Sequence, residues 1–262
     1  LVLIPLALLL TWIGGLAFRL FVGLIALAII YEWLTITAGR DWGRMHWMIA
    51  GLLAGVMLLL AAGLAPGLLL LLTIAATVIS LVVARFSGLD HWPPSGILYA
   101  GLSAISLAML RDGDIAGLWA IFFLFAVVWV TDIAAYFVGR AIGGAKLAPR
   151  ISPGKTWSGA IGGAIGGIAA GLIVAIIAEV RLGLVVFAGL ALLLSVVAQM
   201  GDLFESHLKR RYAVKDSSNL IPGHGGVMDR VDGLVAAAVA FYVVGILLAG
   251  PGDPAHAFFS TG

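Results

Sequence analysis

Residues 201–232 hold the densest run of charged and polar side chains in a chain that is otherwise strongly apolar. The run reads GDLFESHLKRRYAVKDSSNLIPGHGGVMDRVD, and it lies between two hydrophobic segments. Charged groups next to membrane spans are costly, so they are retained mainly where they have a function. Carboxylates close to cations suit the binding of a divalent metal ion together with phosphate groups.

The acids of this run predict a magnesium site where two helices meet. Asp202 lies on a polar stripe with alternating steps of four and three residues, the spacing of one helix face. The stripe consists of Ser195, Gln199, Asp202, Ser206 and Lys209, with Glu205 three residues after the aspartate. Asp229 and Asp232 are three residues apart and share a face of the next helix. We expect Asp202, Asp229 and Asp232 to bind Mg²⁺, although Asp229 could instead cap its helix.

The segment before the last helix has the features of an anion-binding loop. Gly225 and Gly226 let consecutive backbone N–H groups converge ahead of a helix N-terminus, where phosphate binds well. His224 lies between glycines and is a candidate for phosphate contact or proton movement. The alternative for His224 is a solvated loop histidine without a chemical role.

A basic cluster precedes this loop and consists of Lys209, Arg210, Arg211 and Lys215. It could act only as a topological signal that faces anionic lipid headgroups. However, Lys209 lies on the acidic stripe and Lys215 adjoins Asp216. These positions favour a more specific role in binding phosphates.

A second polar segment, Ser152-Pro153-Gly154-Lys155-Thr156, leads into another apolar span. Its Gly-Lys-Thr triplet is reminiscent of a P-loop, but Pro149 stands where that motif requires its first glycine, and we expect no strand before it. We therefore reject a P-loop NTPase. A cation and a hydroxyl at a helix N-terminus still suit the binding of an anion.

Two acids lie inside apolar spans, where each needs a partner. Asp132 precedes Tyr136 by one helical turn, late in a span that leads to the second polar segment. Glu32 lies in a span near the N-terminus with fewer polar neighbours.

The composition places these motifs in a helical membrane protein. Of 262 residues, 62% are hydrophobic and 11% are charged, whereas soluble domains carry roughly 25% charged residues. The absence of cysteine excludes disulfides and thiolate metal sites. Segments of about 20 apolar residues predict an all-α transmembrane bundle with about nine spans. We place the spans at 1–17, 18–38, 45–63, 66–85, 96–110, 115–138, 157–179, 182–200 and 229–249.

Residues 1–262 are expected to form a single membrane domain, with N-terminal spans in 1–110 and a catalytic half in 115–249. The first two spans are separated only near Gly14–Gly15, and the fifth span is short and could be tilted or incomplete. In the seventh span, Gly159, Gly163, Gly167 and Gly171 share one face, and Gly162 and Gly166 repeat the spacing. Such small residues let helix backbones approach closely, so we expect a packing face, with a dimer contact as the alternative.

The basic residues predict the orientation in the membrane. With nine spans, 12 of the 15 Lys and Arg residues fall on the side of the N-terminus and of the loops after even-numbered spans. Only Arg19, Arg111 and Arg181 fall on the other side. Because cytoplasmic loops are enriched in Lys and Arg, the N-terminus and both polar loops are expected in the cytoplasm. Adding or removing one span would scramble this asymmetry, which favours nine.

Taken together, these motifs resemble the signature of the phosphatidate cytidylyltransferase family, also called CDP-diacylglycerol synthases. The resemblance is carried by Ser206-x-Leu208-Lys209-Arg210, by Lys215-Asp216 with Ser218, and by Ile221-Pro222-x-His224-Gly225-Gly226-Val227-x-Asp229-Arg230-Val231-Asp232. Upstream it extends to Gly201-Asp202-Leu203-Phe204-Glu205, Ser152-Pro153-x-Lys155-Thr156 and Asp132-x-x-x-Tyr136. It therefore covers the C-terminal half, while the N-terminal spans agree only in hydropathy.

The resemblance implies that CTP and phosphatidic acid react to give CDP-diacylglycerol and pyrophosphate, in phospholipid biosynthesis. It implies Mg²⁺, leaves room for a second, monovalent cation such as K⁺, and implies a homodimer. The metal ligands would be Asp202, Asp229 and Asp232, and the other catalytic residues Lys209, Lys215, Asp216 and His224. The substrate-binding set would be Asp132, Ser152, Lys155, Thr156, Ser206, Arg210, Gly225, Gly226 and Arg230. The expected location is a bacterial inner membrane, with the active site on the cytoplasmic side.

Two other functions fit parts of the pattern. A cation transporter or channel could use membrane acids, but it would favour acids near the middle of the bilayer rather than at the predicted cytoplasmic edge. A CTP-dependent lipid kinase would use related chemistry on a different acceptor. The expected partners are CTP, phosphatidic acid, membrane lipid and a second copy of the chain, and nucleic acid is not among them.

Overall fold

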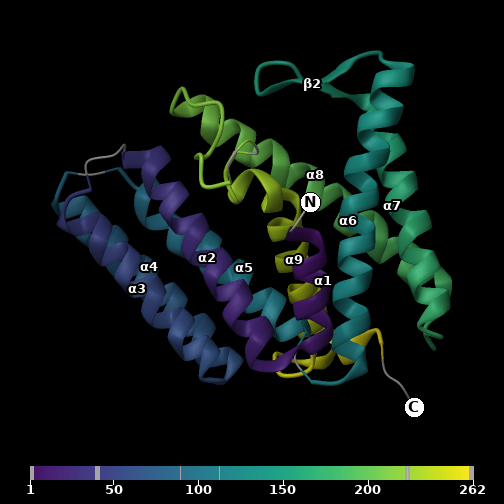
Figure 1. The fold of residues 1–262 in the computed structure, drawn as a ribbon, viewed down its shortest axis with the longest axis horizontal. Helices are drawn as coiled ribbons and strands as arrows, with labels where there is room; N and C mark the ends of the chain where they lie inside the picture. Colours follow the sequence, from purple (N-terminus) through teal and green to yellow (C-terminus); the bar gives the residue numbers. More distant parts are fainter. Residues whose placement is uncertain are drawn as a thin grey trace. The chain divides into compact units, whose positions relative to one another are not determined.

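The computed structural model describes residues 3–38, 42–88, 90–111, 113–221, 223 and 225–259. It confirms a helical membrane protein (Figure 1). The helices are α1 (Leu3–Ile13), α2 (Gly15–Ala38), α3 (Arg44–Ala61), α4 (Pro66–Phe86), α5 (Trp92–Arg111), α6 (Ile115–Ile142), α7 (Trp157–Ile177), α8 (Leu184–Arg211), α9 (Met228–Ala249) and the 3-10 helix η1 (Pro254–Ala257). Two short strands, β1 (Lys146–Ala148) and β2 (Ser152–Thr156), lie between α6 and α7.

Within the described residues, eight helices, α2 to α9, are long and apolar enough to cross a membrane. The first predicted span is instead α1, whose 11 residues extend about 16 Å, roughly half of a bilayer's apolar thickness. The break falls at Gly14 and Gly15, which have positive φ angles of 66° and 53°. The loops between α2 and α9 keep their predicted sides whether or not α1 belongs to a span. The basic asymmetry therefore does not distinguish nine spans from eight.

Helix α5 is longer than the fifth span that we expected from the sequence. It has 20 residues and begins at Trp92, because Pro93 and Pro94 occupy the first turn, where a missing N–H is tolerated. Most of its length is buried against α2, α3 and α4. Gly96 lies against Trp33 of α2, whose indole nitrogen donates to the Trp92 carbonyl oxygen at 2.7 Å. The helix is therefore a complete span that neighbouring helices shield.

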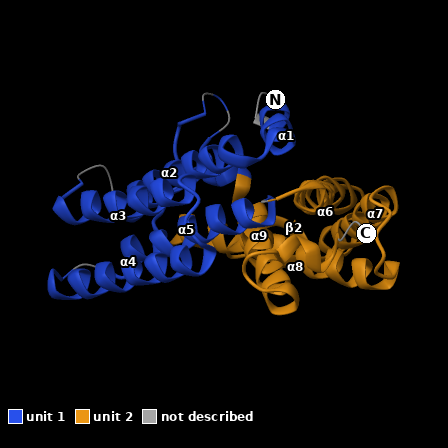
Figure 2. Cartoon of the chain, turned by 90° about the horizontal axis from the view of Figure 1, so that it is seen from below, with its two compact units in different colours: residues 1–112, 212–230 blue, residues 113–211, 231–262 orange. Residues whose placement is uncertain are grey.

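The chain divides into two compact units (Figure 2). Unit 1 comprises residues 1–112 and 212–230, and unit 2 comprises residues 113–211 and 231–262. Buried aliphatic and aromatic side chains such as Trp33 and Leu53 fill unit 1. The core of unit 2 contains a cluster of aromatic rings, among them Phe123, Phe187 and Phe241. The first turn of α9 belongs to unit 1, and the rest of the helix belongs to unit 2.

The strands form an antiparallel hairpin that contains the second polar segment. This corrects the expectation that no strand is present there, since Gly154, Lys155 and Thr156 lie on β2 itself. Thr156 caps α7, because its Oγ1 accepts the N–H of Gly159 at 3.1 Å. Since β2 passes directly into α7, no glycine-rich loop separates strand and helix within this described segment. The rejection of a P-loop therefore stands.

The glycines of α7 form a packing face, as the sequence predicts, and its partner is α6. A Cβ atom on Gly159 would lie 2.7 Å from the carbonyl oxygen of Ala135, and one on Gly163 would lie 2.8 Å from that of Thr131. The second glycine series also faces α6, since a Cβ on Gly162 would contact Val138. Both series therefore pack against α6 within the chain.

We predict that Gly163→Ala lowers the stability of the bundle by about 1–3 kcal/mol, because the added methyl group must displace backbone. Thermal unfolding in detergent would measure this loss. Gly189→Ala is the matched control, since a Cβ on Gly189 in α8 meets no atom within 4 Å. Equal unfolding temperatures for the two variants would show that the α6–α7 contact is not tightly packed.

Candidate active site

Helix α8 carries the predicted polar stripe, and its side chains contact neighbouring groups of unit 2. Near the middle of the helix, Ser195 Oγ accepts from Thr131 Oγ1 of α6 at 2.9 Å. One turn later, Gln199 Nε2 donates to the carbonyl oxygen of Ala160 in α7 at 3.3 Å. The stripe thus faces α6 and α7, which confirms the helical spacing read from the sequence. Toward the C-terminal end of the helix the stripe becomes charged.

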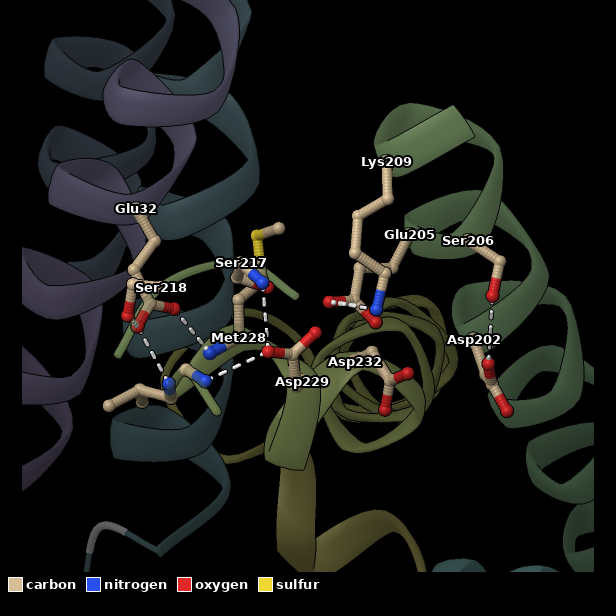
Figure 3. Close-up of polar contacts among 12 residues, drawn as sticks. Glu32, Asp202, Glu205, Ser206, Lys209, Ser217, Ser218, Met228, Asp229 and Asp232 are labelled. Atoms are coloured by element: carbon tan, nitrogen blue, oxygen red, sulfur yellow. Dashed lines mark hydrogen bonds and ion pairs between the residues drawn. The ribbon is translucent and has the colours of Figure 1, made fainter. Parts of the chain in front are cut away.

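The hairpin brings Lys155 to this charged end. Its ammonium group forms an ion pair with Asp202 Oδ2. Ser206 Oγ donates to Asp202 Oδ1 at 3.4 Å (Figure 3). Arg210 Nε also donates to the carbonyl oxygen of Ile151 at 3.3 Å, which joins α8 and the hairpin at a further point. The side chains of Lys155 and Asp202 are 25% and 34% exposed, so an incoming anion can reach this ion pair.

Next to this ion pair, Glu205 and Asp232 form a pair of carboxyl groups within hydrogen-bonding distance of each other. Glu205 is almost completely buried, at 2% exposure, and Lys209 Nζ lies 3.3 Å from its Oε1 (Figure 3). Two carboxylates this close repel each other unless a proton or a cation lies between them. In the sequence Glu205 stood out only as a neighbour of Asp202, because burial is not visible from spacing.

Asp132 of α6 completes this group of acids in unit 2. Its electrostatic neighbours are Asp232, Asp202 and Lys155, so residues from α6, β2, α8 and α9 share one polar environment. Among these neighbours only Lys155 carries the opposite charge that an acid in a membrane helix requires. We name the group of Asp132, Lys155, Asp202, Glu205, Lys209 and Asp232 the acidic cluster.

The acidic cluster fits Mg²⁺ through a pair of carboxyl groups rather than through a complete set of ligands. No group of three or more acidic or histidine side chains is close enough to hold a metal ion by itself, within the described part of the chain. Mg²⁺ rarely needs such a group, because it is usually bound by one or two carboxylates together with substrate phosphates and water. The adjacent carboxyl groups of Glu205 and Asp232 fit this requirement, and they gain from a cation that offsets their repulsion.

In unit 1, the buried Glu32 organises the polar loop ahead of α9. Glu32 is completely buried, and its Oε1 accepts from Ser218 Oγ at 2.5 Å and from the Val227 N–H at 2.8 Å. Its Oε2 accepts from the Met228 N–H at 2.6 Å (Figure 3). The carboxylate therefore binds the N-terminus of α9, where a negative charge is favoured. The sequence could not identify these partners, which lie more than 180 residues away.

Asp229 has a structural role in the same loop. Its Oδ2 accepts the N–H groups of Ser217, at 2.9 Å, and of Gly226, at 2.8 Å. Asp229 thus accepts backbone N–H groups just ahead of α9, which resembles the capping role that the sequence left open. It has a consequence for the proposed anion loop: the N–H groups of Gly226, Val227 and Met228 bind protein carboxylates rather than pointing at an empty anion site.

The remaining predicted residues lie on the same two segments. Ser152 and Thr156 belong to the hairpin of unit 2. Lys215 and Asp216 are exposed on the loop of unit 1, where Gly225 adopts a positive φ of 83°. Arg230 is exposed in the first turn of α9. His224 and Pro222 lie outside the described residues. Of the three predicted metal ligands, Asp202 and Asp232 thus lie in unit 2 and Asp229 in unit 1.

Comparison with known protein families decides the identity of the chain. Residues 1–248 match the family described as the cytidylyltransferase family. The chain belongs to this family. The match extends over the N-terminal spans, where hydropathy alone carried the resemblance, and it confirms the assignment made from the C-terminal motifs.

Several phosphatidate cytidylyltransferases are similar to the chain, and those of Brucella are similar over nearly its whole length. The phosphatidate cytidylyltransferase of Brucella suis is 49% identical over 253 residues, which cover 96% of this chain and 92% of the relative. The corresponding protein of Brucella abortus is 48% identical over the same coverage. The phosphatidate cytidylyltransferase of Bacillus subtilis is 42% identical over 135 residues, which cover 52% of this chain and 50% of the relative.

Proposed function

We propose that the protein transfers the cytidylyl group of CTP to phosphatidic acid, giving CDP-diacylglycerol and pyrophosphate for phospholipid synthesis. The observation that carries the proposal is the 49% identity to the phosphatidate cytidylyltransferase of Brucella suis over 96% of the chain. The acidic cluster supports it chemically, because it combines carboxylates for a divalent cation with lysines for phosphates.

In this reaction a phosphate oxygen of phosphatidic acid attacks the α-phosphorus of CTP in line. A new phosphoanhydride bond forms, the bond between the α-phosphorus and its bridging oxygen to the β-phosphate breaks, and pyrophosphate leaves with that oxygen. The attacking phosphate is already partly ionised near neutral pH, because the second pKa of a phosphate monoester is about 6. A strong general base is therefore not needed, and catalysis consists mainly of positioning and charge neutralisation.

Each part of the acidic cluster has a role in this chemistry. Asp232 and Glu205 would hold Mg²⁺, which when bound would offset the charge of the triphosphate and of the departing pyrophosphate. Asp202 as a further metal ligand stays a prediction from the family motif. Lys155 would exchange its contact with Asp202 for a substrate phosphate, and Lys209 would remain beside the carboxylates. The role of Asp229 as a metal ligand, and those of Lys215, Asp216 and His224, stay predictions from the family motif, as does a second cation such as K⁺.

The location of this chemistry is also part of the proposal. The distribution of Lys and Arg between the loops supports an active site on the cytoplasmic side of a bacterial inner membrane. The family resemblance supports a homodimer. Phosphatidic acid would then reach the site from the inner leaflet and CTP from the cytoplasm.

Product analysis with two labels tests the proposal. The purified protein, in detergent with phosphatidic acid and Mg²⁺, receives CTP labelled either in the base or in the γ-phosphate. We expect the base label in lipid and the γ label in pyrophosphate. A γ label in lipid would instead identify a lipid kinase. No lipid labelling, together with ion flux through protein-containing liposomes in the absence of CTP, would identify a transporter.

We predict that Lys155→Ala raises the KM for CTP by about 10- to 100-fold, because a charge-assisted contact to phosphate is lost. The unfolding temperature should change little, since the ion pair with Asp202 is partly exposed. Lys146→Ala provides the matched control, because Lys146 is an exposed lysine on the other strand of the hairpin. If the kinetics of the Lys155 variant are unchanged, Lys155 does not bind a substrate phosphate, and the hairpin serves only the topology of the chain.

A further inference from the structure

Unit 1 contains a hollow of about 800 Å³ at the polar loop that precedes α9. One wall is formed by Tyr31 and Thr35, which lie one turn apart on α2, and another by residues 218–220 of the loop. Trp42 and Trp47 line the remaining part. The volume is in the range of small-molecule sites, and the lining combines aromatic rings with hydroxyl and amide groups, as such sites do.

The aromatic rings of this hollow pack against one another. The ring centroids of Tyr31 and Trp42 are 5.5 Å apart, and those of Trp42 and Trp47 are 5.1 Å apart with their planes at 65°. Aromatic residues that only anchor a protein at the membrane–water interface need not surround a common space. These rings instead enclose a space together with polar groups, and flat aromatic faces of this kind stack well on a nucleobase.

The loop that forms one wall of the hollow is held in place by hydrogen bonds. Ser218 Oγ donates to the buried Glu32 at 2.5 Å and accepts the N–H of Leu220 at 3.0 Å. Glu32 follows Tyr31 on α2, so the helix that supplies one wall also fixes the other. Asn219 lies between these anchored residues and lines the hollow with an amide, which both donates and accepts hydrogen bonds.

We propose that this hollow binds the cytosine base of CTP, an inference that rests on the proposed function. Stacking on the tryptophan rings supplies affinity. The Asn219 amide recognises the base edge, since its oxygen accepts from the exocyclic amino group of cytosine and its nitrogen donates to a ring acceptor. Residues 218–220 belong to the polar loop of unit 1, so the base would be held by this loop and by α2.

The test uses Trp47→Ala and Asn219→Ala in the full-length protein. Trp47 is 65% exposed, so its removal should leave the fold intact. We expect the KM for CTP to rise about tenfold in the Trp47 variant, because a base–aromatic stack is lost. The KM for phosphatidic acid should stay unchanged. In the Asn219 variant the preference for CTP over UTP should fall about tenfold. The matched control is Trp12→Ala, which removes a tryptophan that is 67% exposed on α1.

The outcomes separate this inference from the proposed function. If the unmodified protein places no cytidine in lipid, the proposed function fails. If it does so, but both variants keep their KM for CTP and their preference for CTP over UTP, the base does not bind in the hollow. A rise in the KM for phosphatidic acid alone would overturn the inference as well, since it would assign the hollow to the lipid. Direct binding of labelled CTP without lipid, weakened by Trp47→Ala but not by Trp12→Ala, would support it.

Discussion

Asp232→Asn is expected to lower kcat by about 1000-fold or more while the protein stays folded. The physical reason is that the amide cannot hold the cation that offsets several kcal/mol of charge in the transition state. The stability of the folded protein should not fall together with the activity. Burial and the neighbouring Asp202 both disfavour the negative charge of Asp232, so removing this charge should leave the unfolding temperature unchanged or higher.

The combined measurement of turnover and thermal unfolding makes this prediction specific. Asp253→Asn serves as the control, because the Asp253 side chain in unit 2 is 74% exposed ahead of η1. It should change neither quantity. If Asp232→Asn loses activity only because it unfolds, or if it remains fully active, the acidic cluster does not perform the chemistry.

Glu32→Gln is expected to lower kcat by about 10- to 100-fold, although Glu32 belongs to no motif of the family signature. The amide oxygen can still accept hydrogen bonds at one of the two oxygen positions, but the NH₂ group at the other position would face a backbone N–H at the start of α9. A buried donor without an acceptor costs about 1–3 kcal/mol, which corresponds to this range. The loss should appear as greater mobility of the loop from Ser217 to Met228.

Hydrogen exchange distinguishes this positioning role from a general loss of stability. Amides of the loop should exchange faster in Glu32→Gln, while those of α3 and α4 in the same unit stay protected. Ser218→Ala should give a smaller effect, because it removes one of the donors to Glu32 and leaves the backbone donors satisfied. Glu179→Gln, at an exposed glutamate after α7, should have no effect. Uniformly faster exchange across unit 1 would contradict a local role for Glu32.

The sequence predicted the helices well because each span is a long apolar segment with a clear end. The Gly14–Gly15 pair was harder to interpret, because a turn between two spans and a break after a short helix have the same sequence pattern. The hairpin was missed because its strands have three and five residues and contain Pro153 and Gly154, which disfavour strands. Pro93 and Pro94 suggested a break, although they occupy the first turn of α5.

The candidate site was partly predictable for a similar reason. Helical spacing correctly placed Asp202, Ser206 and Lys209 on one face of α8, and a charged residue at the start of α7 suggested the role of Lys155. Spacing alone could not show that Glu205 is buried against Asp232. It also could not show that Glu32, from a distant helix, takes the N–H groups expected to bind phosphate. Both depend on tertiary packing, which no local pattern encodes.

Binding of a divalent cation tests the central claim most directly, that the carboxylates of α8 and α9 hold the metal ion of the CTP complex. Mn²⁺ can replace Mg²⁺ as a probe, because both prefer oxygen ligands. Equilibrium dialysis with CTP on both sides measures the extra Mn²⁺ that the protein retains. We predict retention by the unmodified protein and by Asp253→Asn, and its loss in Asp232→Asn. Equal retention by all three proteins, or none by any of them, would contradict the account.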